Sequence, residues 1–297
     1  MEPIVKILPL FDKTHPDFVG RTRYMHVGGG LGDIFNHLYQ CPCYPDLETL
    51  KEGERAFVFV SSHNSCAWEL FAWHRNADKI TLADVGIQNI LYSEREDDRR
   101  RKEEIGFISD CDHRWPIPGP VIYYPPPEDV KTIADMKALG KYVVFALTAS
   151  DIGRSIRKEQ GEQAAKICEE LGYKVALTGR NYQFNDHGNK AQRREEIRLE
   201  TPGIVDLIDK LTVPGTAQLI EGAAAVFTCH SALCHIAWHL RKPTFVLYDD
   251  FAKGAYFTNK FEGYSFGAAF PGNDHASLNE YTGDRFINFI KGVPLAT

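Results

Sequence analysis

An aspartate follows a glycine-rich turn near the start of the chain, at the point where a helix should begin. The stretch HVGGGLGDIFNHLYQ, residues 26–40, has four glycines in five positions and then Asp33. Such a turn usually cradles phosphate, but neither G-x-G-x-x-G nor a glycine-lysine-serine/threonine pattern is present, which argues against a dehydrogenase or a phosphate-loop enzyme. Asp33 is therefore a candidate general base, and capping of the helix is the competing interpretation. The glycines that would let a substrate approach the backbone are Gly29, Gly30 and Gly32.

A second stretch, FTCHSALCHIAWHLRKPTFVLY at 227–248, predicts a strand that ends near Cys229 and a helix that begins near Ser231. The first N–H groups of a helix have no partner within it, so they form an anion site at the end of a strand. The candidate donors are the N–H groups of Ser231, Ala232 and Leu233.

Histidines follow this predicted anion site. His235 lies four residues after Ser231, on the same helix face, where it either serves the site or is satisfied within the core. His230 and His239 complete an H-x4-H-x3-H spacing that turns around a helix without a supporting carboxylate. We therefore expect no metal here.

A third stretch, LTASDIGRSIRKEQ at 147–160, places hydroxyl and basic side chains in a loop after a predicted strand. Cations at the start of a helix oppose its dipole, and an anionic ligand would offset that cost; simple solvation is the alternative. The candidates are Ser150, Arg154, Arg157 and Lys158.

Apolar segments typical of strands alternate with helical patterns along most of the chain, which predicts an α/β protein with parallel sheets. The alternation breaks at 113–130, where six prolines occur in 18 residues. We interpret this segment as a link between two Rossmann-like domains, with a short strand at VIYY, 121–124; a surface loop within one domain is the alternative.

Composition excludes some classes of protein. The 297-residue chain has a net charge of −6, which does not support a nucleic-acid partner, although a modified nucleic acid stays open as an acceptor. No run of 18 apolar residues predicts a membrane span, and the first residues do not resemble a secretion signal. Seven cysteines without framework spacing suggest reduced thiols, and so a cytoplasmic location.

Taken together, the order and spacing of GGGLGDI, ASDIGRSIRK and HSALCHIAWHLRKPTFVLY resemble the heptosyltransferase-like glycosyltransferases, over about residues 24–248. In that family the first motif reads L-G-D-[IV] and the last reads D-T-G-x-x-H-x-A-x5-P. Here His235, Ala237 and Pro243 match the last motif, and Ser231 stands for its threonine. The chain departs from the family at His230 and Ala232, and at Pro214, where relatives often have a carboxylate.

The resemblance implies a GT-B fold, in which two Rossmann-like domains face a central cleft. It implies an acceptor domain at 1–126, a nucleotide-sugar donor domain at 127–278, and a C-terminal helix, 279–297, that packs back on the first domain. It also implies inverting transfer of a hexosyl- or heptosyl-type sugar without metal or cofactor, with Asp33 as the base toward an acceptor hydroxyl, for example on a glycan. The donor's phosphates would bind the candidate residues of the second and third stretches. These are Ser231, Ala232, Leu233 and His235, and Ser150, Arg154, Arg157 and Lys158.

Two other functions fit the same residues. A nucleotide-sugar epimerase or hydrolase on this fold would act without a second acceptor. A catalytically silent nucleotide- or sugar-binding protein would bind the donor without any turnover that depends on Asp33. The donor's sugar and nucleobase, the acceptor and the role of residues 249–278 are open from sequence.

Overall fold

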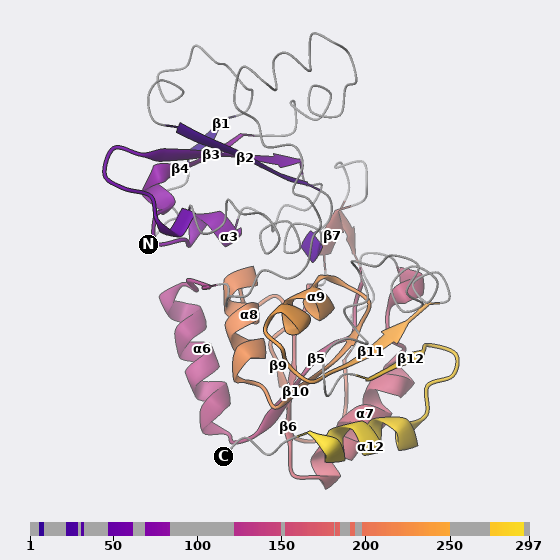
Figure 1. Ribbon diagram of the computed structural model, residues 1–297. Coiled ribbons are helices and arrows are strands. Elements are labelled where there is room, and N and C mark those ends of the chain that lie inside the picture. The colour runs from indigo at the N-terminus through magenta and orange to yellow at the C-terminus, as the bar shows by residue number, and fades with distance from the viewer. Residues whose placement is uncertain are drawn as a thin grey trace. The chain divides into compact units, whose positions relative to one another are not determined.

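The protein divides into two compact units in a computed structural model (Figure 1). One comprises residues 1–118 with 186–188, and the other 119–185 with 189–297. The structure describes residues 6–8, 22–28, 31–32, 47–61, 69–83, 122–149, 152–180, 182–184, 191–193, 198–249 and 274–293. The assignment of acceptor and donor domains, divided at 126/127, stays a prediction. No helix in the described part of the chain is long and apolar enough to cross a membrane.

The first unit contains a four-stranded parallel sheet with strand order β1-β4-β3-β2. Its strands are β1 Lys6–Leu8, β2 Thr22–Gly28, β3 Arg55–Ser61 and β4 Ile80–Ala83. The helix α3 spans Glu69–Ala72, and a 3₁₀ turn, η3, spans Ala77–Lys79. The apolar segments RYMHV, AFVFVSS and KITLADV, at 23–27, 56–62 and 79–85, predict strands, and β2, β3 and β4 confirm them. Beyond residues 31–32, which are helical, the helix predicted at 33–39 lies outside the described residues.

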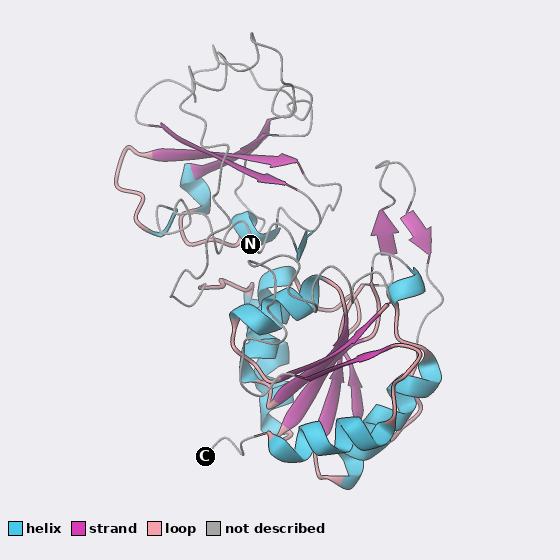
Figure 2. Ribbon diagram, turned by 45° about the vertical axis from the view of Figure 1, so that its right-hand side comes forward, coloured by secondary structure: helices cyan, strands magenta, loops and turns pink. Residues whose placement is uncertain are grey.

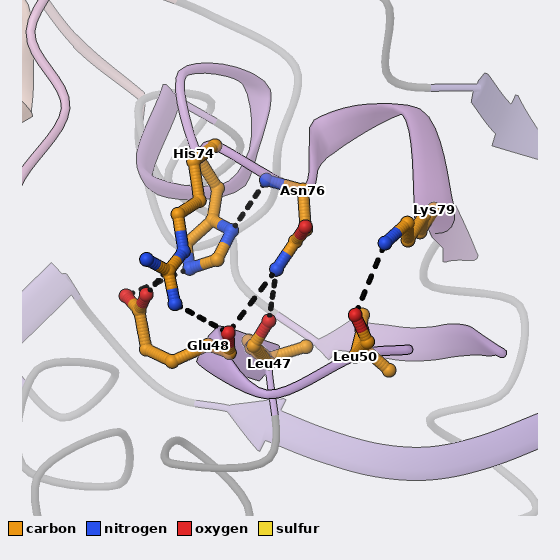
Figure 3. A network of polar contacts seen from close by, with 7 residues as sticks. Leu47, Glu48, Leu50, His74, Asn76 and Lys79 are labelled. Atoms are coloured by element: carbon orange, nitrogen blue, oxygen red, sulfur yellow. Dashed lines mark hydrogen bonds and ion pairs between the residues drawn. The ribbon is translucent and has the colours of Figure 1, made fainter. Parts of the chain in front are cut away.

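A polar network ties the segment 47–50 to the end of α3 (Figure 3). His74 Nδ1 accepts from the Asn76 backbone N–H at 3.1 Å, so the proton of the neutral ring lies on Nε2 and is donated to Glu48 Oε1 at 3.0 Å. Asn76 Nδ2 also donates to the Leu47 carbonyl at 2.7 Å. Burial lowers the pKa of His74, and the Glu48 carboxylate acts in the opposite direction. A histidine is therefore accommodated at this buried position because both of its ring nitrogens are hydrogen-bonded.

The second unit is built on a six-stranded parallel sheet with strand order β12-β11-β10-β5-β6-β9. Its strands are β5 Tyr142–Ala146, β6 Lys174–Leu177, β9 Ile204–Asp206, β10 Ala225–Cys229, β11 Thr244–Tyr248 and β12 Asp274–Ser277. The chain builds outward from β5 to β6 and β9, then returns to the other side of β5 with β10. In a doubly wound sheet the ligand crevice lies outside the carboxyl ends of the strands where the order reverses, which here is between β5 and β10.

Helices cover both faces of this sheet (Figures 1 and 2). On one face α6, Pro127–Ala138, packs beside α8, Val213–Gly222, which in turn packs beside α9, Ala232–His239. On the other face α7, Lys158–Glu170, packs beside α12, Gly283–Gly292. Successive side chains along each strand point to opposite faces of the sheet.

Aromatic side chains fill the core under α7 and α12. Parallel register places Phe145, Phe227 and Phe245 on successive strands in one row. Phe286 of α12 packs edge-on against Phe227, with ring centroids 4.9 Å apart. On the opposite face the hydroxyl of Tyr142 donates to the Leu219 carbonyl of α8 at 2.8 Å. Burial of these rings fixes the β5–β10 pair on which the site depends.

A buried carboxylate closes the start of α8. Asp129, in the first turn of α6, accepts from the Thr212 backbone N–H at 2.9 Å and from the Thr212 hydroxyl at 2.5 Å. Thr212 is the N-cap of α8, and its side chain accepts from Gly215 N–H at 3.2 Å. A Cβ on Gly215 would meet Asp129 Oδ2 at 2.0 Å, so only glycine fits there. α6 and α8 are therefore locked together at this end.

In the second half, strands lie within KYVVFAL, YKVALTG, GIVDLI, AAVFTC and PTFVLY, as their apolar patterns predict. The helical patterns after the first of these strands and at SALCHIAWHL correspond to α7 and α9. The predicted strand at 121–124 is wrong for residues 122–124, which form no regular element. The proline-rich link gives way to a helix, since Pro127 occupies the first turn of α6, where a missing N–H costs little. The C-terminal helix begins at Gly283 rather than near 279. The antiparallel hairpin of β7, Tyr182–Phe184, and β8, Ala191–Arg193, was not predicted.

Candidate functional site

The candidate site lies where the loops after β5 and β10 leave the same edge of the sheet. These strands pair in parallel with Thr228 opposite Ala146, and the Thr228 hydroxyl donates to the Ala146 carbonyl at 3.2 Å. One loop continues to α7 and the other to α9. This arrangement brings two of the three stretches singled out from sequence to one position in the fold.

The start of α9 is open. Ser231 is the N-cap in an extended conformation, with φ −148° and ψ −179°, but its side chain makes no capping hydrogen bond. Its Oγ is buried and has no hydrogen-bond partner among the described residues. Cys234 N–H donates to the Ser231 carbonyl at 3.1 Å, while the N–H groups of Ala232 and Leu233 have no acceptor within the helix. The predicted helix start is confirmed, and its donors suit an anion.

Arg154 lies in the loop after β5, the strand that pairs with β10. It ends the 3₁₀ turn η5, Ile152–Arg154, and is half-buried. The loop is closed by two hydrogen bonds, from Ile156 N–H to the Leu147 carbonyl at 2.8 Å and from Ala149 N–H to Ser155 Oγ at 3.1 Å. Burial lowers the pKa of His230, the residue before Ser231, and the positive charge of Arg154 lowers it further.

Arg157 and Lys158 are exposed and already have partners. Arg157 Nη2 donates to Asn279 Oδ1 at 3.1 Å, and Lys158 Nζ pairs with Glu200 Oε1 at 2.6 Å. Hydrogen bonding to Glu200 raises the pKa of Lys158, and the charges of Glu162 and Glu159 act in the same direction. The Glu200 carboxylate therefore offsets the cost of Lys158 at the start of α7, and the Asn279 amide oxygen satisfies one donor of Arg157. The predicted role of both residues in donor binding stays a prediction.

His235 and His230 form a buried pair, with ring centroids 5.6 Å apart. Burial lowers the pKa of His235 well below its usual value. Burial and the nearby Arg154 lower that of His230 to about 4, against the opposing charge of Asp249. Both rings are therefore neutral at neutral pH and offer hydrogen bonds or a metal-ligating nitrogen rather than positive charge.

The sequence analysis did not select His230 and Cys234 as site residues. His230 N–H donates to the Leu247 carbonyl at 3.0 Å, so His230 extends the β10 edge by one residue. The sequence feature that could have identified His230 as a site residue is its position between a buried strand and the N-cap Ser231. The ligating atoms of His230, Cys234 and His235 all lie within 4.8 Å of one another. The structure thus groups Cys234, not His239, with the two histidines.

Four of the predicted residues, Gly29, Gly30, Asp33 and Ser150, lie outside the described residues. Gly32 is half-buried in the short helical segment 31–32. The acceptor-side loop and the general base therefore stay predictions. Of the predicted donor-binding residues, the structure brings together Arg154, Ser231, Ala232, Leu233 and His235, while Arg157 and Lys158 bond to Asn279 and Glu200.

Known proteins share this fold. Residues 124–256 match the family model described as glycosyltransferase family 9 (heptosyltransferase). The structure of E. coli ADP-heptose lipopolysaccharide heptosyltransferase II is similar with a TM-score of 0.53 and 13% identity, covering 91% of this chain and 98% of that chain. The structure of E. coli heptosyltransferase WaaC with ADP-2-deoxy-2-fluoro heptose is similar with a TM-score of 0.53 and 12% identity, covering 91% of this chain and 99% of that chain.

A glycosyltransferase family 9 protein from Veillonella parvula gives a TM-score of 0.52 and 10% identity, covering 92% of each chain. No curated protein matches the sequence. At these identities the likeness concerns the fold, and it confirms the predicted α/β, GT-B fold class.

Proposed function

We propose that the chain is a heptosyltransferase-like glycosyltransferase, since residues 124–256 match family 9, and that it transfers a sugar from a nucleotide-sugar donor to an acceptor hydroxyl by inverting, metal-independent displacement. The observation that carries the proposal is the open start of α9 beside Arg154, at the reversal of strand order in the second unit. Two helix N–H groups, an unpartnered buried hydroxyl and a guanidinium there suit a diphosphate.

The departing nucleoside diphosphate presents the largest electrostatic demand of such a reaction. Donors that are fixed before the reaction stabilise developing charge without having to reorient. Ala232 and Leu233 supply backbone N–H groups, Ser231 a hydroxyl, and Arg154 a full positive charge. His235 adds a neutral ring N–H. Arg157 and Lys158 reach the outer phosphate when they exchange Asn279 and Glu200 for it.

Asp33 is proposed as the base. The acceptor oxygen attacks the anomeric carbon from the face opposite the diphosphate, the bond from that carbon to the phosphate oxygen breaks, and the hydroxyl proton passes to Asp33. An ordinary aspartate, with a pKa of about 3.9, is a weak base toward an alcohol. Proton transfer is therefore late, when an oxocarbenium-like transition state has made the hydroxyl more acidic.

Donor and acceptor are proposed only by chemical class. E. coli heptosyltransferase WaaC binds ADP or ADP-2-deoxy-2-fluoro heptose in its solved structures, so adenine nucleotides are the first to test. His230 and Ala232 replace the aspartate and glycine of the family motif, which leaves the sugar open. The free, buried thiols of Cys168, Cys229 and Cys234 are consistent with the proposed cytoplasmic location.

The donor site is tested by thermal unfolding with nucleoside diphosphates and nucleotide sugars, first with a chelator and then with magnesium. A ligand at about one hundred times its Kd stabilises the folded protein by roughly 2.7 kcal/mol. We expect stabilisation by one nucleotide in either condition. If the unfolding temperature rises only when magnesium is present, the metal-independent reaction is contradicted. If no nucleotide raises the unfolding temperature, the donor site is contradicted.

The base is tested by Asp33→Asn. Turnover should fall by about 10² or more, the usual scale for a positioned base, while donor affinity stays unchanged. Asp135→Asn is the matched control, because Asp135 is exposed on α6 and pairs only with Lys131 in the described structure. Unchanged turnover in Asp33→Asn would rule out the base. Product formed without an acceptor would indicate a hydrolase or an epimerase, and binding without turnover a silent protein.

A further inference from the structure

Two imidazoles and a thiol meet beneath the open start of α9. The nitrogens of His230 and His235 and the sulfur of Cys234 all lie within 4.8 Å of one another, and all three residues are buried. The backbone explains the grouping. Ser231 is extended, so the chain leaves β10 through His230 and turns directly into the first turn of α9, which carries Cys234 and His235. Residues four and five positions apart thereby share one side of the helix start.

The donor types favour a borderline or soft metal ion. Zinc binds histidine nitrogen at about 2.0–2.1 Å and cysteine sulfur at about 2.3 Å in tetrahedral geometry, which sets ligand atoms roughly 3.3–3.6 Å apart. The cluster needs to contract by about 1 Å to reach this geometry, and side-chain rotation can supply that movement. Calcium and magnesium prefer oxygen ligands, and this cluster contains none.

Charges of both signs surround the cluster. Burial raises the pKa of the Cys234 thiol, so the thiolate forms only when a bound metal ion displaces its proton. Asp249, directly after β11, favours a cation, whereas Arg154 in the loop after β5 opposes one. His239, at the other end of α9, acts on His235 from a greater distance along the helix. The carboxylate of Asp249 thus opposes the charge of Arg154, and the thiolate that forms when an ion binds adds a second negative charge.

We propose that His230, Cys234 and His235 bind one zinc-type ion, with a fourth position left for an outside ligand. The ion holds the end of β10 against the first turn of α9 and so fixes the N–H groups at that helix start. This inference goes beyond the proposed function and does not depend on it. It departs from the expectation from sequence that these histidines bind no metal, because Cys234 rather than His239 completes the group. The displacement proposed above needs no magnesium-type ion on the diphosphate, and a histidine that ligates through one ring nitrogen keeps the other for a hydrogen bond.

Cobalt(II) is the probe, because a thiolate ligand gives it a charge-transfer band and tetrahedral coordination gives it intense visible bands. The full chain is stripped with a chelator under reducing, oxygen-free conditions and titrated with cobalt. We expect one cobalt per chain with both spectral features, and their displacement by zinc. No thiolate band in the unmodified protein would overturn the proposal.

Two cysteine variants locate the thiolate. Cys234→Ala should lose the charge-transfer band, whereas Cys168→Ala, which removes a buried thiol from the core between α7 and the sheet, should keep it. A band that persists in Cys234→Ala would overturn the site, because the cobalt would then be held by other cysteines. If Cys234→Ala fails to fold by circular dichroism, His230→Gln decides. A cobalt affinity at least about tenfold weaker supports the site, and an unchanged affinity overturns it.

Discussion

The starts of α8 and α9 differ although the two helices pack side by side in the same unit. α8 is closed by the protein itself, since Asp129 accepts from the N–H and the hydroxyl of Thr212, and Thr212 caps Gly215. α9 has an N-cap of a similar kind, Ser231, whose hydroxyl makes no such bond among the described residues. Each helix presents the same partial positive charge at its start. One is neutralised by an internal carboxylate, and the other stays available to a ligand.

This difference separates stability from binding. Breaking the closed end of α8 removes contacts that the folded chain makes in every state, so the free energy of unfolding must fall. Altering the open end of α9 removes donors that the folded chain does not use, so the affinity for an anion must change instead. Three predictions test this separation, from the largest expected effect to the smallest.

Gly215→Ala should destabilise the second unit by about 2–3 kcal/mol, in the range of overpacked sites. The added Cβ would meet Asp129 Oδ2 at 2.0 Å and its Cβ at 2.9 Å, so the whole side chain must move away from Thr212. Urea unfolding measures the change. Gly292→Ala is the control, because a Cβ there meets nothing within 4 Å and should leave the unfolding free energy nearly unchanged. Equal midpoints for the two variants would contradict the closed end.

Acid should weaken the second unit through His239, at the far end of α9. A histidine at a helix C-terminus usually gains a proton more easily, but burial lowers the pKa of His239 to about 3. The unfolded chain therefore binds more protons, and the stability is complete above about pH 6.5 and is lost as pH falls toward 3, by up to about 1.4 kcal/mol per pH unit.

His239→Gln tests this origin of the acid sensitivity. Unfolding free energies between pH 7 and 4 should fall less steeply in the variant than in the unmodified protein. The same slope in both would show that the acid sensitivity arises elsewhere.

Thr212→Val and Ser231→Ala form the smallest and most discriminating pair. Loss of the cap in Thr212→Val should cost about 1 kcal/mol of stability and leave nucleotide affinity unchanged. Ser231→Ala should leave stability unchanged and weaken nucleotide binding by roughly three- to tenfold, the value of one hydrogen bond. Thermal unfolding and calorimetric titration measure the two quantities. If both variants changed the same quantity, the two helix starts would not differ in role.

Local sequence patterns were sufficient for the elements that frame the site. The apolar runs at 142–146, 225–229 and 244–248 predict buried parallel strands because every side chain in them is apolar or small, and the structure has strands there. The start of α9 at Ser231 was predictable for a similar reason, since a small polar residue between a strand and an apolar helix favours an N-cap. The resemblance of ordered motifs supplied the fold class.

Contacts between distant residues could not be predicted in this way. Lys158 pairs with Glu200 and Asp129 with Thr212, across 42 and 83 positions in the chain, and no local pattern specifies either partner. The helix α6 was missed because its prolines, which here lie at its start, usually exclude a helix.

The sequence by itself determined the strands and the helix that frame the site, because periodicity and capping act over a few neighbouring residues. It also determined which charged and hydrogen-bonding side chains each loop contains. Only the tertiary structure decided which helix start is filled and which is open, and that His230, Cys234 and His235 form one cluster. The physical reason is that strand order brings loops far apart in the chain to one edge of a sheet, and that edge determines each charged group's partners.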